Sequence, residues 1–142
     1  MKKRVIVFCI MLSMLSLVVC KQNSINDDVI TGVGASIKFK EKEITNAINT
    51  VKSDFDFKGC TLKKVWYDEE KSNYFTKTYL GNGKGSINGA KIENVIVLLS
   101  DFDVDSLGGD GSFEPNSTYG EWQWVLIRDD KESDWKIDDW GY

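Results

Sequence analysis

The stretch that decides the fold is residues 41–55, with the sequence EKEITNAINTVKSDF. Its apolar residues recur at intervals of three and four, the spacing of one helix face; they are Ile44, Ala47, Ile48, Val51 and Phe55. Glu41 and Glu43 fall in the first turn, where a carboxylate opposes the positive end of the helix dipole. Gly59 lies just beyond, where a helix commonly ends. We therefore predict an amphipathic helix that buries Ile44, Ile48, Val51 and Phe55 against a sheet.

Downstream of this helix the hydrophobic period shortens toward two, which is typical of strands. We expect strands over residues 62–67, 94–104, 121–128 and 135–140. The run 94–104 begins with a continuous apolar half, which indicates a central position in the sheet. Residues 74–80 fit either a strand or a short helix, and the glycines of 81–89 predict a flexible loop. The fold class is thus α+β, with an N-terminal helix packed on a strongly bent antiparallel sheet of four to five strands.

Residues 1–20 have the pattern of an export signal. Lys2, Lys3 and Arg4 precede an apolar run over 5–19, and this order is typical of a secretory signal. As a helix the run would rise about 22 Å, which is short of the hydrocarbon core of about 30 Å, so a permanent membrane span is disfavoured.

The apolar run ends in Leu17-Val18-Val19-Cys20, which resembles the lipobox of bacterial lipoproteins. The resemblance implies that the Cys20 thiol receives a diacylglycerol and becomes the mature N-terminus. Val19 departs from the pattern, which has a small residue there, and ordinary signal cleavage is the alternative. We expect an extracytoplasmic protein that is lipid-anchored to the cell membrane, or otherwise secreted, with a flexible tether over 21–38 and one domain over 39–142.

Composition excludes several classes of site. The 142 residues contain 18 Lys+Arg, 22 Asp+Glu and no His, so the commonest general base and transition-metal ligand is missing. Three cysteines cannot assemble a thiolate zinc site, and the acidic balance argues against a nucleic-acid partner. We expect no cofactor. Cys60 is predicted to be a small buried hydrophobe rather than a nucleophile, because no His can activate it.

Several stretches resemble small exported proteins of Gram-positive bacteria; they are 41–44 (EKEI), 57–60 (FKGC), 66–68 (WYD), 94–100 (NVIVLLS) and 135–142 (WKIDDWGY). The last stretch is also similar to the final strand of NTF2-like (cystatin-like cone) domains. The resemblance covers roughly residues 38–142 and implies a helix in the concavity of a bent antiparallel sheet. The shared motifs are structural, so no functional residues carry over. NTF2-like domains usually have two or three N-terminal helices, whereas one is predicted here, which implies a shallow or open pocket.

Alternating carboxylates suggest a calcium site in the segment 101–110. The candidates are Asp101, Asp103, Asp105 and Asp110. An EF-hand loop starting at Asp101 would need Gly at its sixth position and Glu at its twelfth, where this chain has Ser106 and Ser112. Side chains two residues apart on a strand are separated by about 6.6 Å, too far to share one ion without a bend. We favour the alternative of a solvated strand face.

Two acid pairs, Asp129-Asp130 and Asp138-Asp139, could serve general acid/base chemistry in an NTF2-like enzyme. Neighbours on a strand point to opposite faces, so each pair should contribute at most one inward carboxylate. Acid pairs are also expected by chance here, because twelve of the 22 acids follow Ser100. We therefore do not expect an enzyme.

Tryptophans gather near the end of the chain, and Trp122, Trp124 and Trp140 are the candidate binding surface. Trp122, Trp124 and Leu126 share one face of their strand, while Val125 and Ile127 share the other. One apolar face must meet the helix. The other should meet a ligand, an unknown protein partner or a second copy in a homodimer through the sheet face.

These observations favour an exported, lipid-anchored binding or interaction domain without catalysis. The alternatives are an NTF2-like enzyme that uses an inward carboxylate, and a calcium-binding module at 101–110.

Overall fold

The computed structural model describes residues 28–142. Its elements, in chain order, are β1 (Ile30–Gly32), α1 (Glu41–Asp54), β2 (Cys60–Trp66), α2 (Glu69–Asn82), α3 (Gly85–Asn88), a 3-10 turn η1 (Ile92–Asn94), β3 (Val95–Val104), β4 (Thr118–Ile127) and β5 (Lys136–Gly141). The predicted export signal, Cys20 and residues 21–27 lie outside the described residues. The chain is of the α+β class, with α1 packed on a curved, open sheet, as predicted.

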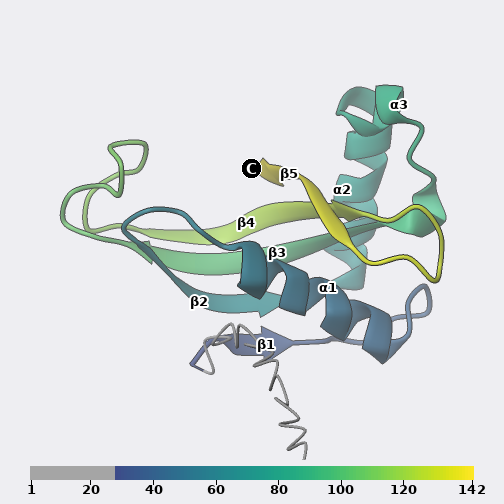
Figure 1. Ribbon diagram of the computed structural model, residues 1–142, viewed down its shortest axis with the longest axis horizontal. Coiled ribbons are helices and arrows are strands. Elements are labelled where there is room, and N and C mark those ends of the chain that lie inside the picture. Colours follow the sequence, from purple (N-terminus) through teal and green to yellow (C-terminus); the bar gives the residue numbers. More distant parts are fainter. Residues whose placement is uncertain (1–27) are drawn as a thin grey trace, which may run out of the picture.

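The five strands follow one another across the sheet in the order β1-β2-β3-β4-β5 (Figure 1). β2 to β5 are antiparallel neighbours, as predicted. β1 instead pairs with β2 in parallel, with Ile30 opposite Lys64, because the chain crosses over through α1 between them. The prediction of a wholly antiparallel sheet is therefore wrong at this edge. β3 has a neighbour on each side and is buried along most of its length, which confirms its central position.

The flexible tether predicted over 21–38 is wrong for the part that the structure describes. Residues 30–32 form β1, and Val29 beside it is only 7% exposed. The segment after β1 is also held, because the Glu69 carboxylate accepts a hydrogen bond from the Ile37 N–H at 3.1 Å. The sequence did not predict β1 because a strand of three residues is too short to show a hydrophobic period. Its partner β2 also lies more than 30 residues further along the chain.

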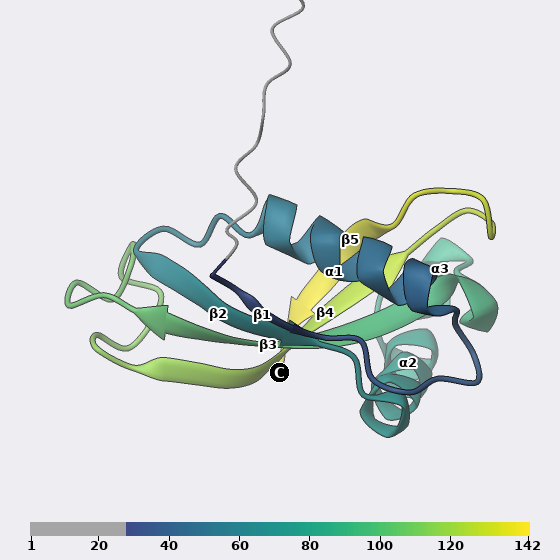
Figure 2. The same cartoon turned by 90° about the horizontal axis from the view of Figure 1, so that it is seen from below.

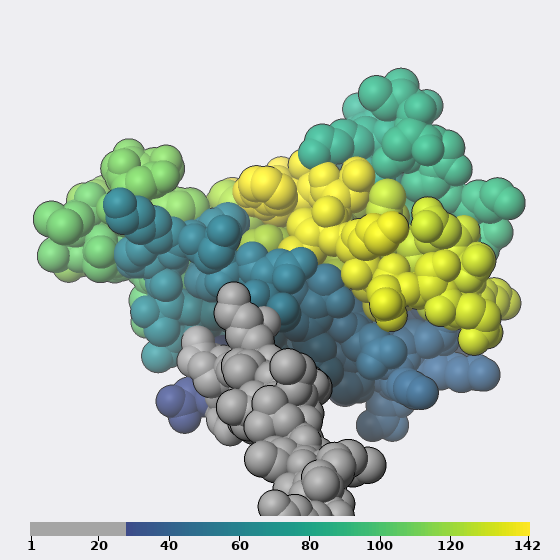
Figure 3. Space-filling view, viewed as in Figure 1, coloured from purple at the N-terminus to yellow at the C-terminus, as the bar shows by residue number. Residues whose placement is uncertain are grey.

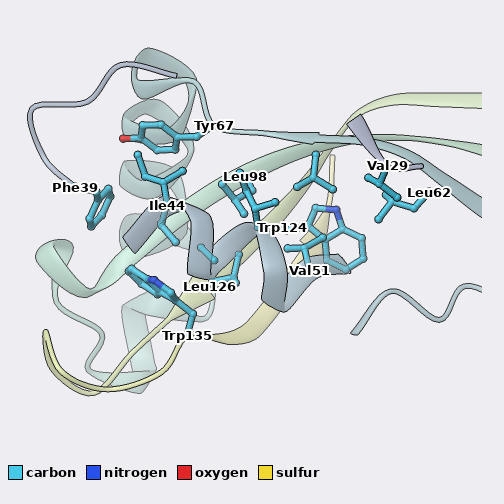
Figure 4. Packing of buried hydrophobic residues seen from close by; sticks show 14 residues of the cluster. Val29, Phe39, Ile44, Val51, Leu62, Tyr67, Leu98, Trp124, Leu126 and Trp135 are labelled. Carbon is cyan, nitrogen blue, oxygen red and sulfur yellow. The ribbon is translucent and has the colours of Figure 1, made fainter. Parts of the chain in front are cut away.

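α1 confirms the predicted helix and its buried face. The Lys40 N–H donates to Glu43 Oε2 at 2.8 Å, which closes the first turn. Ile44, Ile48 and Val51 are almost completely buried. Figure 4 shows Ile44 and Val51 in the same cluster as Leu98, Trp124 and Leu126 of the sheet.

The end of α1 differs from the prediction. The helix stops at Asp54, and Phe55 follows it in an extended conformation as a half-buried residue. Gly59 does not end the helix but lies in the turn into β2 with a φ of 69°. A Cβ at Gly59 would come within 2.5 Å of an oxygen of Asp105, so the turn needs glycine to approach the β3–β4 loop.

α2 resolves the ambiguity of residues 74–80 in favour of a helix. Asp68 caps it by accepting a hydrogen bond from the Lys71 N–H at 2.9 Å. Tyr79 packs on Val95, Val97 and Val125, on the sheet face opposite α1. Figure 2 shows α1 on one side of the sheet and α2 on the other. The predicted flexible loop over 81–89 is wrong in part, because α3 occupies 85–88.

The second helix changes the expectation about the two apolar faces of β4. Val125 is 8% exposed under α2, and Ile127 packs in the same cluster. The bare sheet face that suggested a homodimer is therefore covered by the chain itself in the described residues.

Three β-bulges bend the sheet. They lie between Leu62 and Lys64 of β2, opposite Ser100 to Phe102 in β4, and opposite Val125 to Leu126 in β5. At the second bulge Glu121 adopts a positive φ of 55°. Bulges add twist and reorient side chains, and the last one decides where the carboxylates of β5 point.

Candidate binding surface

Aromatic side chains fill the sheet face beyond the C-terminal end of α1. Phe102 and Trp124 are 0% and 2% exposed and form the floor. The Phe55 ring lies over both, at 5.7 and 6.0 Å between ring centroids. Phe57 stacks on Trp124 at 5.4 Å. The concavity next to α1 is therefore packed with rings, as in a protein core.

Phe57 and five further rings form a continuous layer around this core, which we call the aromatic face; the five are Phe113, Tyr119, Trp122, Trp140 and Tyr142. Trp122 lies at the centre of the aromatic face. The centroid of its ring is 6.0 Å from that of Phe57, 5.9 Å from that of Tyr119 and 5.0 Å from that of Tyr142. Phe57 also lies 6.4 Å from Trp140. These separations and the predominantly tilted or edge-to-face geometry are those of favourable aromatic pairs.

The aromatic face joins segments that are distant in the sequence. Phe57 follows α1, Phe113 comes from the β3–β4 loop, and the other four rings come from β4, β5 and the residue after it. Figure 3 shows the segment after α1 lying beside β5 on this side of the molecule, with the green β3–β4 loop as a lobe at one end.

The rings at the edge of the aromatic face are open to solvent. Trp140 is 54% and Tyr142 is 72% exposed, whereas Phe57, Phe113, Tyr119 and Trp122 are half-buried. Large aromatic rings that remain exposed in a contiguous group usually mark an interaction surface. The prediction that Trp140 and Trp122 lie at a surface agrees with this arrangement. It is wrong for Trp124, which the rings of Phe55 and Phe57 cover.

Polar groups are few on the aromatic face. The Trp122 Nε1 donor is buried and has no hydrogen-bond partner among the described residues. The Tyr119 hydroxyl accepts from the Glu114 N–H at 3.2 Å. Burial and the nearby Tyr119 and Asp101 raise the pKa of the Tyr142 hydroxyl, so the ring stays neutral at ordinary pH.

The four carboxylates of the suggested calcium segment accept hydrogen bonds from nearby groups of β4 and the β3–β4 loop instead. Asp101 accepts from the Glu121 N–H at 3.1 Å, and Asp103 accepts from the Thr118 hydroxyl at 2.7 Å. Asp105 accepts from two backbone N–H groups in the β3–β4 loop, each at 2.9 Å, and Asp110 accepts from one at 3.0 Å. Within residues 28–142, no group of three or more acidic or cysteine side chains is placed to hold a metal ion.

The carboxylates of Asp138 and Asp139 lie near α2 and α3, away from the concavity beside α1. The expectation that these neighbours point to opposite faces of the strand is wrong. The bulge in β5 brings both onto one face, although neighbours on a regular strand would point apart. Asp138 accepts from the Tyr79 hydroxyl at 2.8 Å, and Asp139 pairs with Lys84 at 3.2 Å. Burial raises the pKa of Tyr79 to about 12, and the hydrogen bond to Asp138 adds to this effect.

These contacts border a groove of about 220 Å³ between α2 and the β4–β5 pair, lined in part by Phe75, Tyr79 and Asp139. The carboxylates of Asp138 and Asp139 beside this groove are bound by Tyr79 of α2 and by Lys84, which precedes α3. These contacts therefore hold the helical segment against β5. The other acid pair, Asp129-Asp130, is exposed at the start of the β4–β5 loop. Asp129 pairs with Lys136 at 3.6 Å, and Asp130 accepts from the backbone of its own turn.

Cys60 is half-buried at the start of β2, less enclosed than predicted. Burial, together with Asp105 and Asp110, raises the pKa of its thiol. A raised pKa keeps the sulfur protonated and a poor nucleophile.

Sequence reasoning missed Phe57, Phe113, Tyr119 and Tyr142 as members of the aromatic face. Tyr142 could have been found, because it is two residues beyond Trp140, and side chains two residues apart on an extended chain point to the same side. Phe57 and Phe113 lie outside regular elements and carry no periodic signal, so only the tertiary structure places them.

Among residues 28–142, no helix has the length and apolar character needed to cross a membrane. Comparisons with curated proteins and with solved structures give no match. A protein-family comparison matches residues 37–141, which include α1 and all elements after it. The chain therefore belongs to the family described as a domain of unknown function, DUF4829.

Proposed function

We propose that this protein is an extracytoplasmic binding domain, anchored to the membrane through Cys20, and that the aromatic face docks a basic, partly apolar segment of a partner protein. The observation that carries the proposal is the contiguous layer of six rings whose edge, Trp140 and Tyr142, is more than half exposed. Tryptophan and tyrosine provide most of the binding energy in many protein interfaces.

Charge supports a basic partner. From Asp101 onward the chain has 12 acidic and 3 basic residues, a formal charge of −9. This part of the chain contributes five of the six rings, and its Asp101 lies close enough to the aromatic face to raise the pKa of the Tyr142 hydroxyl. Complementary charge speeds association and selects among partners, and the same charge disfavours a second copy of this domain.

The NTF2-like resemblance belongs to the proposal as well. A helix on the concave side of a bent sheet supports it. The position of α2 on the opposite face is a departure from the arrangement that the resemblance implies.

The docking proposal can be tested by titrating residues 28–142 with defined probes while tryptophan fluorescence is recorded. The probes are a peptide of alternating lysine and leucine, its counterpart with glutamate in place of lysine, and a neutral oligosaccharide. We expect a saturable change with the lysine peptide alone and at least tenfold weaker binding to Trp140→Ala.

Tyr74→Ala is the matched control, because Tyr74 is a 67% exposed ring on α2, outside the aromatic face. Equal loss of binding in both variants, preference for the acidic peptide or the oligosaccharide, or no response to any probe would each contradict the docking proposal.

The anchor is tested separately with the full chain. Cys20→Ser should abolish incorporation of labelled fatty acid and move the protein from the membrane fraction to the soluble fraction. Unchanged labelling and fractionation of that variant would refute anchoring at Cys20.

A further inference from the structure

A second cavity lies away from the aromatic face, where the N-terminal end of α1 meets the β4–β5 loop. Its volume is about 950 Å³, and its walls come from residues 36–43, Asn46, Glu93, Arg128 and residues 131–135. Figure 3 shows the yellow β4–β5 loop on the same side of the molecule as the blue segment that leads into α1.

Arg128 is the unusual residue of this cavity. Its side chain is only 3% exposed. The guanidinium carbon lies 4.4 Å from the centroid of the Trp135 ring and 5.9 Å from that of Phe39. The guanidinium therefore packs against two rings that are themselves edge-to-face, with 5.8 Å between their centroids. Such packing fixes the orientation of the guanidinium, which is a requirement for a selective binding group.

Only one of the three guanidinium nitrogens has partners among the described residues. Nη1 lies 2.7 Å from Glu43 Oε1 and donates to the Lys131 carbonyl at 3.4 Å. Nε is buried without a hydrogen-bond partner, and none is found for Nη2. A buried arginine is expected to use its donors fully, because each unmet donor costs free energy.

The two unused nitrogens lie on the same edge of the planar guanidinium. Their N–H groups point in parallel and match the two oxygens of a carboxylate or phosphate. The structural role of Arg128, holding α1 to the β4–β5 loop through Glu43, uses Nη1 and leaves this edge free.

The charges around the cavity narrow the ligand class. The basic residues of its lining are Lys38, Lys40, Lys42, Arg128 and Lys131. The acidic residues are Glu41, Glu43, Glu93, Glu132 and Asp134, so the formal charges cancel. Because the charges cancel, the lining offers a doubly charged phosphate no net attraction, whereas a molecule with one carboxylate and one ammonium finds partners of both signs.

We propose that this cavity binds a small zwitterionic molecule, an amino acid or a short peptide, whose carboxylate accepts from Nε and Nη2 of Arg128 and whose ammonium lies among the acidic residues of the lining. The carboxylate enters from the Nη2 side, and a small side-chain movement of the kind common on binding completes the contact with the enclosed Nε. This site is independent of the aromatic face and of the membrane anchor.

The test follows the Arg128 Nε–H resonance by nitrogen-15 NMR in the full chain. The probes, at equal ionic strength, are glycylglycine, acetate, glycinamide and inorganic phosphate. Glycylglycine should shift the resonance saturably, acetate should do so at least about tenfold more weakly, and glycinamide should leave it unchanged. No shift with glycylglycine at about 20 mM, well above a Kd of about 1 mM, would overturn the proposal. So would a response to phosphate that equals or exceeds the response to glycylglycine.

Arg128→Lys keeps the positive charge but removes the paired donors, so glycylglycine should bind at least tenfold more weakly, as judged from the Trp135 indole resonance. Lys136→Gln removes an exposed cation outside the cavity and should leave the affinity unchanged. If Arg128→Lys does not fold, the titration of the unaltered protein decides by itself. Equal affinity of Arg128→Lys and the unaltered protein would refute the role assigned to Arg128.

Discussion

Val51 offers the sharpest test of how the fold is held together. It is 0% exposed on the inner face of α1, in the cluster that contains Trp124 (Figure 4). Val51→Ala removes two buried methyl groups and should cost about 2 kcal/mol, the transfer free energy plus a small cavity. Val51→Asp also buries a carboxylate without a partner, which adds several kcal/mol. The sum, at least about 4 kcal/mol, approaches the whole stability of a domain at the low end of about 5–15 kcal/mol.

The assay is urea unfolding of residues 28–142, followed by tryptophan fluorescence. Asn49→Asp is the control, because it places the same charge on the exposed side of α1 and should change the free energy of unfolding by less than about 0.5 kcal/mol. Val51→Ala should unfold at lower urea with an unchanged slope, and Val51→Asp should be unfolded without urea at neutral pH. If Val51→Asp were as stable as Asn49→Asp, the packing of α1 on the sheet described above would be wrong.

Three further predictions concern stability. Trp124→Ala should cost about 3–5 kcal/mol in urea unfolding and Trp140→Ala less than about 1 kcal/mol, because only Trp124 is buried; similar losses would contradict this division. Partial burial alone would raise the pKa of Glu43, but hydrogen bonds from the Lys40 N–H and from Arg128 outweigh it and hold the pKa below its usual value. The ionised Glu43 side chain therefore stabilises the fold above a pH of about 4.3, and this contribution is lost as the pH falls through the lowered pKa. In Glu43→Gln the melting temperature should fall less steeply with decreasing pH, and an equally steep fall would contradict the role of Glu43. Because the pKa of Tyr79 is raised to about 12, the unfolded state loses this proton first, and stability should fall between a pH of about 10 and 12; Tyr79→Phe should melt with a weaker alkaline dependence, and an equally steep loss would exclude Tyr79 as its source.

The helix α1 could be predicted from the sequence, whereas α2 could not be told from a strand. The period of α1 was detectable because one side of the helix meets the core and the other meets water. α2 buries Ser72, Thr76 and Tyr79, two of which are polar. The Ser72 hydroxyl accepts a hydrogen bond from the Val97 N–H at 3.0 Å. A helix that packs through such residues has a weak hydrophobic period, which is why residues 74–80 remained ambiguous.

The candidate surface was predictable only in part. The alternation of Trp122 and Trp124 along β4 indicated a shared face, and the structure places both there. Whether each ring is covered depends on Phe55 and Phe57, which lie outside regular elements. The expectation that Asp138 and Asp139 point to opposite faces of β5 was wrong for a related reason. A bulge depends on the register between two strands and not on local residue preference.

The sequence by itself determined the α+β class, the face of α1, the central position of β3 and the acidic character of the C-terminal half. These properties follow from periodicity and composition, which act locally. The tertiary structure alone decided that β1 joins the sheet, that α2 covers the second apolar face, that six rings form one surface and that Arg128 is buried with two unused nitrogens. Each of these depends on contacts between residues far apart in the chain, and such contacts have no period in the sequence.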